Sequence, residues 1–342
     1  MLNTLDLCSG IGGFRSGLEP LNCFRFVGHC EIDEKTEQAY RALYNTEGDY
    51  FCSDIRKIYP RDLPPIDLVC AGFPCQTFSV AGQRMGFRDD TRGSIFFEVA
   101  RIVAEKRPRI LLLENVPGLL SHDQGRTFET VLATLAELGY AVEWCVHNSA
   151  FFGVPQQRRR IYIVGHLDPE RCGEIFPIES ICGETLKELI GGSQGNRVYD
   201  PAGIACTQCA TAGGKGAKTG LYLVDLNSDP VMTETARCLV ARYDKGISNH
   251  RGECSGVLDE TMPPIVRIRD KNDVYHQGSI RRLTPQECWR LQGFTDEQFA
   301  KVKALGMSDS VLYKMAGNAV SVPVVRAIGE KIIKVYKEDE NA

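Results

Sequence analysis

Residues 4–14 read TLDLCSGIGGF, a short apolar run that leads directly into a glycine-rich turn. The run predicts a strand, and the turn predicts the start of a helix, because glycines permit the tight reversal between the two. Gly10, Gly12 and Gly13 also let backbone amides approach a ligand. A dinucleotide site expects the order G-x-G-x-x-G. The order here is G-x-G-G-F, which disfavours a nicotinamide dehydrogenase.

The same alternation of element types continues outward from this turn. Short apolar runs alternate with longer amphipathic stretches through the first half of the chain. This pattern predicts an α/β fold whose mostly parallel, Rossmann-like sheet is covered by helices on both faces. The expected strands are residues 4–7, 24–30, 50–53, 66–71, 110–113 and 160–165, and the expected helices are residues 34–43, 94–104 and 127–138.

The composition and periodicity of the sequence change after about residue 166. Glycine-rich, poorly periodic sequence follows, and it predicts a second, smaller domain of short strands and irregular structure. Thr284, Pro285 and Glu287 then have the spacing of a helix start with a capping box, and a last helix is expected after Pro323. We expect a first domain at 1–175 that is completed by 305–338, a second domain at 176–280 and a hinge segment at 281–304.

The bulk composition restricts the class of protein. The 342 residues are 43% hydrophobic and 25% charged, which is the balance of a globular protein. No apolar run approaches the ~20 residues that span a bilayer, and the N-terminus lacks a signal-peptide pattern, so we expect a cytoplasmic protein without membrane contact. The 14 cysteines lack a framework spacing and are interpreted as reduced thiols. The net charge of −4 disfavours a protein that coats nucleic acid, although it allows a local basic groove.

Acidic residues follow two further expected strands. Glu31 stands at the end of the second strand and Asp54 at the end of the third. Because an acid in this place holds a ribose hydroxyl in doubly wound sheets, the three strand ends together favour an adenosine-type ligand. We expect Glu31 on the ribose, Asp54 near the adenine amine and the Phe14 ring stacked on the base.

The apolar strand at 66–71 ends in the string GFPCQTFS, residues 72–79. This string resembles the catalytic motif of the cytosine-5 DNA methyltransferases of bacterial restriction-modification systems. Further strings resemble the other motifs of that family, in the same order along the chain. They are residues 6–14, the string ENV at 114–116, QQRRR at 156–160, RRLTP at 281–285 and GNAV at 317–320. No string matches between 176 and 280, which is where the family has its target recognition region.

The resemblance implies the transfer of a methyl group from S-adenosylmethionine to carbon 5 of cytosine in a specific duplex DNA sequence. Cys75 is then the nucleophile that adds to carbon 6, because a thiolate is nucleophilic near neutral pH and can later leave. Glu114 would keep or share a proton, since burial disfavours its charged form, and would bond N3 and the exocyclic amine. Arg160 would contact O2, and Arg158 would order the loop around Cys75. The implied cofactor residues are Asp6, Gly10, Gly12, Gly13, Phe14, Glu31, Ile32, Asp54, Ile55, Pro74 and Asn318.

A cytosine inside a base-paired stack has to be extruded before it can react. We expect residues 76–91 to be the mobile element that fills the vacated stack or meets phosphate. In the second domain, residues 211–220 and 242–251 are the stretches best suited to face DNA. The pair Cys206 and Cys209 does not suffice for zinc without a second pair, so no metal is expected. The expected DNA contacts are Gln76, Gln83, Arg84, Arg88, Arg242, Lys245 and Arg251.

Two alternatives stay open beside the DNA methyltransferase. One is a transfer RNA branch of the same family, although the Cys-Phe-Thr string of that branch is absent here and a recognition region of about a hundred residues suits DNA. The other is a non-catalytic DNA-binding homologue, which the joint presence of Cys75, Glu114 and Arg160 disfavours. We expect a monomer whose partner is duplex DNA, and a cognate restriction endonuclease is a candidate second partner.

Overall fold

The computed structural model describes residues 1–74, 95–179 and 281–337 and, between 180 and 280, a set of short strands. The chain divides into two compact units. The first unit comprises Met1–His147, Arg159–Glu179 and Ala319–Ala342, and the second comprises Asn148–Arg158 and Ser180–Asn318. Each unit is described by itself below.

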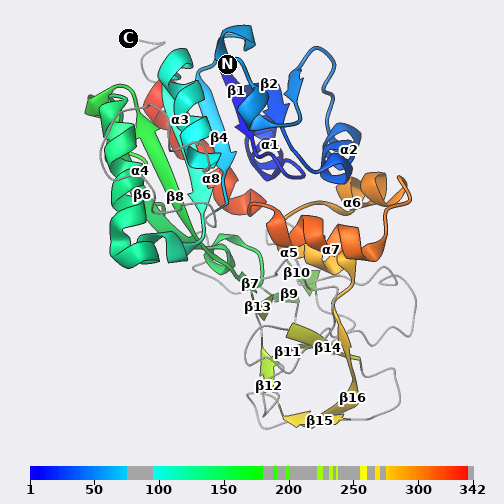
Figure 1. Ribbon diagram of the computed structural model, residues 1–342. Helices are drawn as coiled ribbons and strands as arrows, with labels where there is room; N and C mark the ends of the chain where they lie inside the picture. The colour runs from blue at the N-terminus through cyan, green and yellow to red at the C-terminus, as the bar shows by residue number, and fades with distance from the viewer. Residues whose placement is uncertain are drawn as a thin grey trace. The chain divides into compact units, whose positions relative to one another are not determined.

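A seven-stranded sheet forms the centre of the first unit (Figure 1). Strands β1 to β5 pair in parallel, and β8 is antiparallel to β5. The expected α/β architecture is therefore confirmed, and the turns that follow the parallel strands meet at one edge of the sheet. In sheet order the strands are β3 (Tyr50–Cys52), β2 (Phe24–Cys30), β1 (Leu2–Leu7), β4 (Leu68–Gly72), β5 (Ile110–Asn115), β8 (Arg159–His166) and β6 (Ala141–Asn148).

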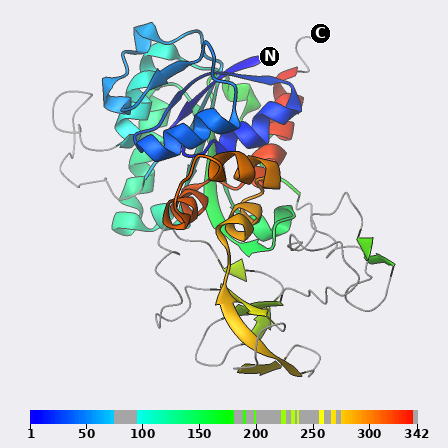
Figure 2. The ribbon, with the colours of Figure 1, turned by 90° about the vertical axis from the view of Figure 1, so that its right-hand side faces the viewer.

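Helices complete the core of this unit. α3 (Ile95–Lys106) and α4 (Arg126–Glu137) bury the apolar side chains Val99, Val131 and Leu135 against the strands, and burial of each such side chain contributes about 1.5–3 kcal/mol. α1 (Gly13–Leu18) packs against α8 (Val322–Lys337) at the other end of the chain. The packing there is close, because a Cβ added at Gly17 would lie 2.7 Å from Val325. The remaining helix is α2 (Glu34–Leu43). Figure 2 shows the ribbon from a second side.

Strand β6 has no counterpart among the expected strands. The side chains that it buries include Glu143 and His147, whereas Trp144 on the opposite face is 44% exposed. The usual pattern of apolar residues inside and polar residues outside is therefore inverted, so alternation of hydrophobicity could not indicate the strand. Buried polar groups of this kind require hydrogen-bond partners.

The partners of Glu143 come from two other parts of the first unit, and one of them, His166, also bonds a third part. His166 Nε2 lies 2.7 Å from Glu143 Oε1, and His166 Nδ1 lies 2.8 Å from the hydroxyl of Tyr336 on α8. The same carboxylate accepts the backbone N–H groups of Ile175 and Phe176. Burial disfavours the charged form, but the hydrogen bonds from His166 and from these amides hold the pKa of Glu143 below its usual value. An ionised carboxylate thus ties β6, β8, α8 and the end of the 159–179 segment together.

In the part of the second unit that the structure describes, short strands come first and helices follow, as the irregular sequence predicted for its first part. Its main sheet has the order β12 (Val231–Thr233), β11 (Tyr222–Asp225), β14 (Ser255–Asp259), β16 (Tyr275–Arg282) and β15 (Val266–Arg269). Smaller pairs join β9 (Glu188–Ile190) to β10 (Val198–Tyr199) and β7 (Gln156–Gln157) to β13 (Ala236–Arg237). The helices are α5 (Pro285–Leu291), α6 (Asp296–Lys303) and α7 (Asp309–Asn318).

The helices of this unit explain where its boundary falls. The capping box expected for α5 is present, with Thr284 as the N-cap and Glu287 at its third position. Trp289 is fully buried, and its indole N–H donates to the carbonyl of Leu312 on α7. Because α7 packs on α5 in this way, residues 305–318 belong to the second unit, whereas the sequence expectation joined them to the catalytic domain. Among the described residues, no helix has both the length and the apolar character needed to cross a membrane.

Candidate active site

Glu31 and the glycine turn meet at the carboxyl ends of β1 and β2. The pairing of these strands places Leu7 beside Cys30, so the residues that follow each strand become neighbours. Glu31 Oε2 accepts the backbone N–H of Gly10 at 2.9 Å, and Oε1 accepts that of Asp33 at 2.8 Å. Burial raises the pKa of Glu31, and these backbone donors oppose the rise. The structure therefore brings together two of the residues that the sequence assigned to the cofactor.

The turn itself depends on its glycines for two different reasons. Gly10 and Gly12 have φ values of +56° and +76°, which residues with a side chain rarely adopt. Gly13 is required for space, because a Cβ there would lie 2.7 Å from the carbonyl oxygen of Val320. The GNAV string at 317–320 thus ends in a residue that packs against the turn.

Two buried polar atoms lie beside this turn. Among the described residues, Asp6 Oδ1 and Ser9 Oγ have no hydrogen-bond partner. Burial raises the pKa of Asp6 well above its usual value, and the nearby Arg15 opposes the rise. Buried polar atoms without partners are rare, so both atoms fit a ligand that supplies hydrogen-bond donors. S-adenosylmethionine has such donors in its ammonium group, its ribose hydroxyls and its adenine amine.

The residues expected around adenine differ in how accessible they are. The Asp54 side chain accepts hydrogen bonds from the guanidinium of Arg56, which hold the pKa of Asp54 below its usual value. Its carboxylate is therefore an acceptor that suits an amine. Ile55 is buried, Phe14 is 1% exposed and Ile32 is 68% exposed. The apolar surface that is free for stacking thus belongs to Ile32, whereas the sequence analysis assigned the stacking to Phe14.

An ion pair joins the two residues expected to contact the cytosine ring. Arg160 Nε lies 3.1 Å from Glu114 Oε1, and the two side chains are 14% and 11% exposed. The antiparallel pairing of β5 with β8 produces this contact, because it places Asn115 opposite Ile161, the residue after Arg160. The Glu114 carboxyl and the Arg160 guanidinium are thus paired with each other and shielded from water at the end of β5.

The chain that leads to Cys75 begins next to this ion pair. Gly72 is the register partner of Glu114 in the pairing of β4 with β5. Asn115 Nδ2 donates to the carbonyl of Phe73 at 2.9 Å, which fixes the chain just before Pro74. Cys75 follows Gly72 by three residues in the sequence.

Arg158 and Asn318 belong to the second unit. The guanidinium of Arg158 is 2% exposed and donates from both terminal nitrogens to the carbonyl of Gly317, at 3.2 Å each. Asn318 is exposed at the end of α7. The described contact of Arg158 therefore fixes the GNAV string, while the loop around Cys75 was its expected target.

Other predicted residues lie outside the described residues. They are the nucleophile Cys75, the contacts Gln76, Gln83, Arg84 and Arg88 of the mobile element, the contacts Arg242, Lys245 and Arg251 of the second domain, and the pair Cys206 and Cys209. In the part of the chain that the structure describes, no group of three His, Cys, Asp or Glu side chains is suited to a metal ion.

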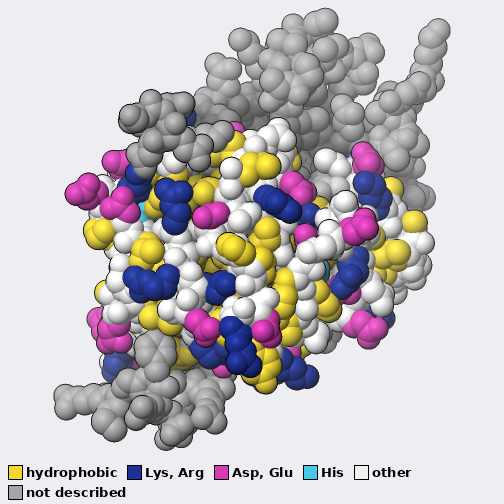
Figure 3. All heavy atoms as spheres, turned by 90° about the horizontal axis from the view of Figure 1, so that it is seen from above, with side chains coloured by type: hydrophobic (Ala, Val, Ile, Leu, Met, Phe, Trp, Pro, Cys, Tyr) yellow, Lys and Arg dark blue, Asp and Glu magenta, His cyan; other side chains and the backbone are white. Residues whose placement is uncertain are grey.

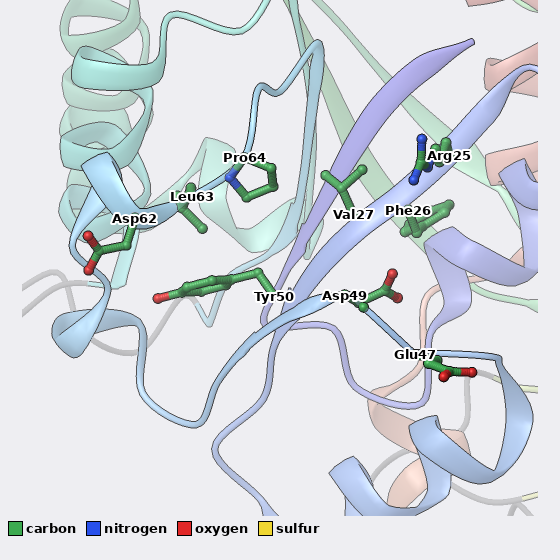
Figure 4. Close-up of a pocket in the computed structure, with 10 residues that line it drawn as sticks. Arg25, Phe26, Val27, Glu47, Asp49, Tyr50, Asp62, Leu63 and Pro64 are labelled. Carbon is green, nitrogen blue, oxygen red and sulfur yellow. The ribbon is translucent and has the colours of Figure 1, made fainter.

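A cavity of about 480 Å³ opens elsewhere in the first unit (Figure 4). Arg25, Phe26 and Val27 at the start of β2 line it, together with Tyr50 at the start of β3. It therefore lies at the amino ends of these strands, at the opposite edge from Glu31. Seen from above, the described surface carries acidic and basic side chains interspersed among apolar ones (Figure 3). This mixed face lacks the basic character expected of a DNA groove.

Several residues around the site were missed by the sequence analysis. Tyr40 donates to Asp6 at 3.5 Å, and Tyr44 bonds the glycine turn. Both come from α2 or its C-cap, four residues apart, and this helical spacing was the signal that could have indicated a shared face. Asn115 was part of a matched string, but its hydrogen bond to Phe73 depends on the pairing of two strands and has no local signal.

Comparisons with known proteins show the family to which the chain belongs. The family model described as C-5 cytosine-specific DNA methylase matches residues 2–334. The Type II methyltransferase M1.ScrFI of Lactococcus lactis subsp. cremoris is 37% identical over 98% of this chain and 79% of its own length, and the Type II methyltransferase M.SsoII of Shigella sonnei is 36% identical over 96% and 79%. The solved methyltransferase EhMeth of Entamoeba histolytica has the same fold, with a TM-score of 0.64 and 18% identity over 98% of each chain. The chain belongs to the C-5 cytosine-specific DNA methylase family.

Proposed function

We propose that this protein methylates carbon 5 of cytosine within a specific sequence of duplex DNA, with Cys75 as the covalent nucleophile. The observation that supports this proposal is the ion pair between Glu114 and Arg160. It lies at the end of β5, beside the strand end from which the chain runs to Cys75. The matching family model is one of DNA methylases and the curated relatives are named methyltransferases, so the transfer RNA alternative and the non-catalytic homologue are not favoured.

The residue types match the demands of the reaction. Addition of the Cys75 thiolate to carbon 6 forms a carbon–sulfur bond and moves an electron pair toward carbon 5, which is otherwise a poor nucleophile. The Arg160 guanidinium can donate to O2 and Glu114 can share a proton with N3, so both stabilise charge on the ring in a shielded setting. After methylation a base takes the carbon 5 proton, the double bond re-forms and the thiolate leaves.

S-adenosylmethionine is the cofactor, and it supplies the methyl group when bound. We assign it to the carboxyl ends of β1, β2 and β3, where Glu31 would hold the ribose hydroxyls and Asp54 the adenine amine. Ile32 would cover one face of the adenine. The other residues assigned to this site are Asp6, Gly10, Gly12, Gly13, Phe14, Ile55, Pro74 and Asn318.

The finer assignments concern recognition and partners. Residues 176–280 would read the DNA sequence, with Arg242, Lys245 and Arg251 among the contacts, and residues 76–91 would close on the flipped base. We expect the protein to act in the cytoplasm as a monomer, with a restriction endonuclease that cuts the same site as a candidate second partner. Residues 1–175 would carry catalysis and residues 281–304 would connect the two functions.

A duplex with 5-fluorocytosine at the target position tests the covalent step. Fluorine cannot leave as a cation, so the adduct should persist as a denaturant-resistant complex when S-adenosylmethionine is present. Cys75→Ala should abolish both the complex and turnover. Bisulfite sequencing of a plasmid from cells that express the protein identifies the target sequence. Turnover by Cys75→Ala, methylation of the exocyclic nitrogen, or activity on transfer RNA alone would contradict the proposal.

A further inference from the structure

We propose that Tyr44 is a positioning residue for the cofactor turn, whose phenol hydroxyl holds the backbone of Ile11 and Gly12 in the conformation that receives S-adenosylmethionine. The hydroxyl lies 2.7 Å from the carbonyl oxygen of Gly12 and 3.2 Å from that of Ile11. It also lies 2.6 Å from Ser16 Oγ on α1. Tyr44 is the C-cap of α2 and is more than 30 residues from the turn in sequence, so only the tertiary fold makes this contact.

Counting hydrogens gives the direction of these bonds. A phenol has one hydrogen and a carbonyl has none, so the hydrogen of Tyr44 goes to the turn, mainly to Gly12 at the shorter distance. The Ser16 hydroxyl then donates its hydrogen to the Tyr44 oxygen. Burial raises the pKa of Tyr44, so the phenol keeps the hydrogen that it donates. The Gly12 carbonyl also accepts the backbone N–H of Ser16 at 2.8 Å, which starts α1.

The ring of Tyr44 and the missing side chain of Gly12 fit together. A Cβ on Gly12 would lie 2.4 Å from Tyr44 Cε2, which is closer than real Cβ contacts. Gly12 is also in the left-handed region, with φ 76° and ψ 44°. The turn therefore has no room for a side chain at residue 12 as long as the Tyr44 ring is in place, and the ring limits how far the turn can relax.

Arg15 fixes the position of Tyr44 from the other side. Its guanidinium lies 5.1 Å from the centre of the Tyr44 ring and donates to the carbonyl of Asn45, the next residue, at 2.7 Å. It also pairs with Asp49 at 2.8 Å and with Glu19 at 3.0 Å. Arg15 belongs to α1, the helix that follows the glycine turn. This helix therefore fixes Tyr44, and Tyr44 fixes the glycine turn.

Loss of the Tyr44 hydroxyl should weaken cofactor binding. Without the hydroxyl, the carbonyls of Ile11 and Gly12 lose a donor and the turn samples more conformations before it binds. The loss should act on affinity and spare the chemical step, because Tyr44 contacts the turn and none of the groups at the end of β5. This inference rests on the assignment of residues 10–13 to the cofactor site.

Tyr44→Phe removes the hydroxyl and keeps the ring. We expect the dissociation constants of S-adenosylmethionine and of S-adenosylhomocysteine, measured by calorimetry in the absence of DNA, to rise about fivefold. The rate constant at saturating cofactor and the KM for DNA should stay within about twofold of the wild-type values, as expected for an effect on ground-state binding. Ser16→Ala should weaken binding in the same direction, and the double variant should lose less than the two losses combined.

Tyr140→Phe is the matched control. Its hydroxyl also donates to a backbone carbonyl, that of Pro108 at 2.7 Å, before the start of β5. The control should lower the melting temperature to a similar degree without a change in cofactor affinity. Wild-type affinity in Tyr44→Phe, or an equal loss in both variants, would show that the hydroxyl is merely structural. If Tyr44→Phe does not fold, Ser16→Ala tests the proposal in the same assay. A wild-type cofactor affinity in Ser16→Ala would show that the linked hydroxyls of Ser16 and Tyr44 do not contribute to cofactor binding.

The outcome for Tyr44 can be separated from the outcome for the whole site. If residues 10–13 do not bind the cofactor, Glu31→Ala will also leave the affinity unchanged. If only the role of Tyr44 is wrong, Glu31→Ala will weaken binding and Tyr44→Phe will not.

Discussion

Arg160 Nε and Glu114 Oε1 lie 3.1 Å apart at the end of β5, with both side chains almost wholly shielded from water. A guanidinium and a carboxyl group at this distance form a charge-assisted hydrogen bond. The pair is formed without a bound cytosine, where β5 and β8 lie side by side.

Glu114→Gln should lower the methylation rate constant about 10²- to 10⁴-fold, because a neutral amide cannot exchange a proton with N3. Single-turnover methylation of a duplex substrate measures this effect. Glu98→Gln is the control, since Glu98 forms a 2.8 Å ion pair with Arg101 on α3 and should leave the rate near that of the wild type. Comparable rates for Glu114→Gln and the wild type would exclude Glu114 from proton exchange.

Glu31→Ala should weaken S-adenosylmethionine binding about tenfold or more, because a carboxylate that accepts hydrogen bonds contributes more than a neutral group. The substitution also frees the N–H of Gly10. Calorimetry measures the affinity, and circular dichroism checks that the fold persists. Asp168→Ala removes another carboxylate that caps a short turn, through the N–H of Glu170, and should leave the affinity unchanged. An unchanged affinity in Glu31→Ala would remove this residue from the site.

Glu143→Gln should destabilise the protein by about 1–3 kcal/mol at pH 7, because the neutral side chain cannot satisfy His166 and the backbone amides equally well. The pKa of Glu143 is below its usual value in the folded state. The stability that it contributes is therefore present above the unfolded pKa of about 4.3 and is lost as the pH falls through the lower folded value. Denaturation curves from pH 3 to 7 should show the two proteins converging at the acid end. A difference that is constant with pH would contradict an ionised Glu143.

Exchange of residues 176–280 with the corresponding segment of a relative should change the DNA sequence that is methylated and leave cofactor affinity as it was. The motive is the absence of family strings in that stretch and its separate compact unit. Bisulfite sequencing of plasmids from cells with either protein compares the targets. An active chimera that kept the original target would place recognition elsewhere in the chain.

The sequence predicted those parts of the fold in which local pattern and burial agree. β5 is apolar from Ile110 to Leu113, where every side chain is buried, and the glycine turn follows β1 directly. β6 was missed because it buries Glu143 and His147, and α6 was missed because only Phe299 and Val302 of its residues are buried. Their stability comes from tertiary partners, which leave no periodic signal.

The candidate site was predictable to a similar extent. Glu31, Gly10 and the pair Glu114 and Arg160 could be proposed from the sequence because each stands at a strand end or in a matched string. Tyr44 was not, since its hydrogen bond to Gly12 spans 32 positions and depends on the packing of α2 against the turn. The adenine-facing surface was assigned to Phe14 because a sequence shows that a residue is aromatic and does not show that it is buried.

The contact between Gly13 and Val320 links the two ends of the chain, and it bears on how the protein is made. Translation at about 5–20 residues per second places Val320 in the chain about 15–60 s after Gly13. Through that interval the nascent sheet has its glycine turn exposed and lacks α8, which packs on α1. The growing chain would have to be protected from aggregation until α8 leaves the ribosome.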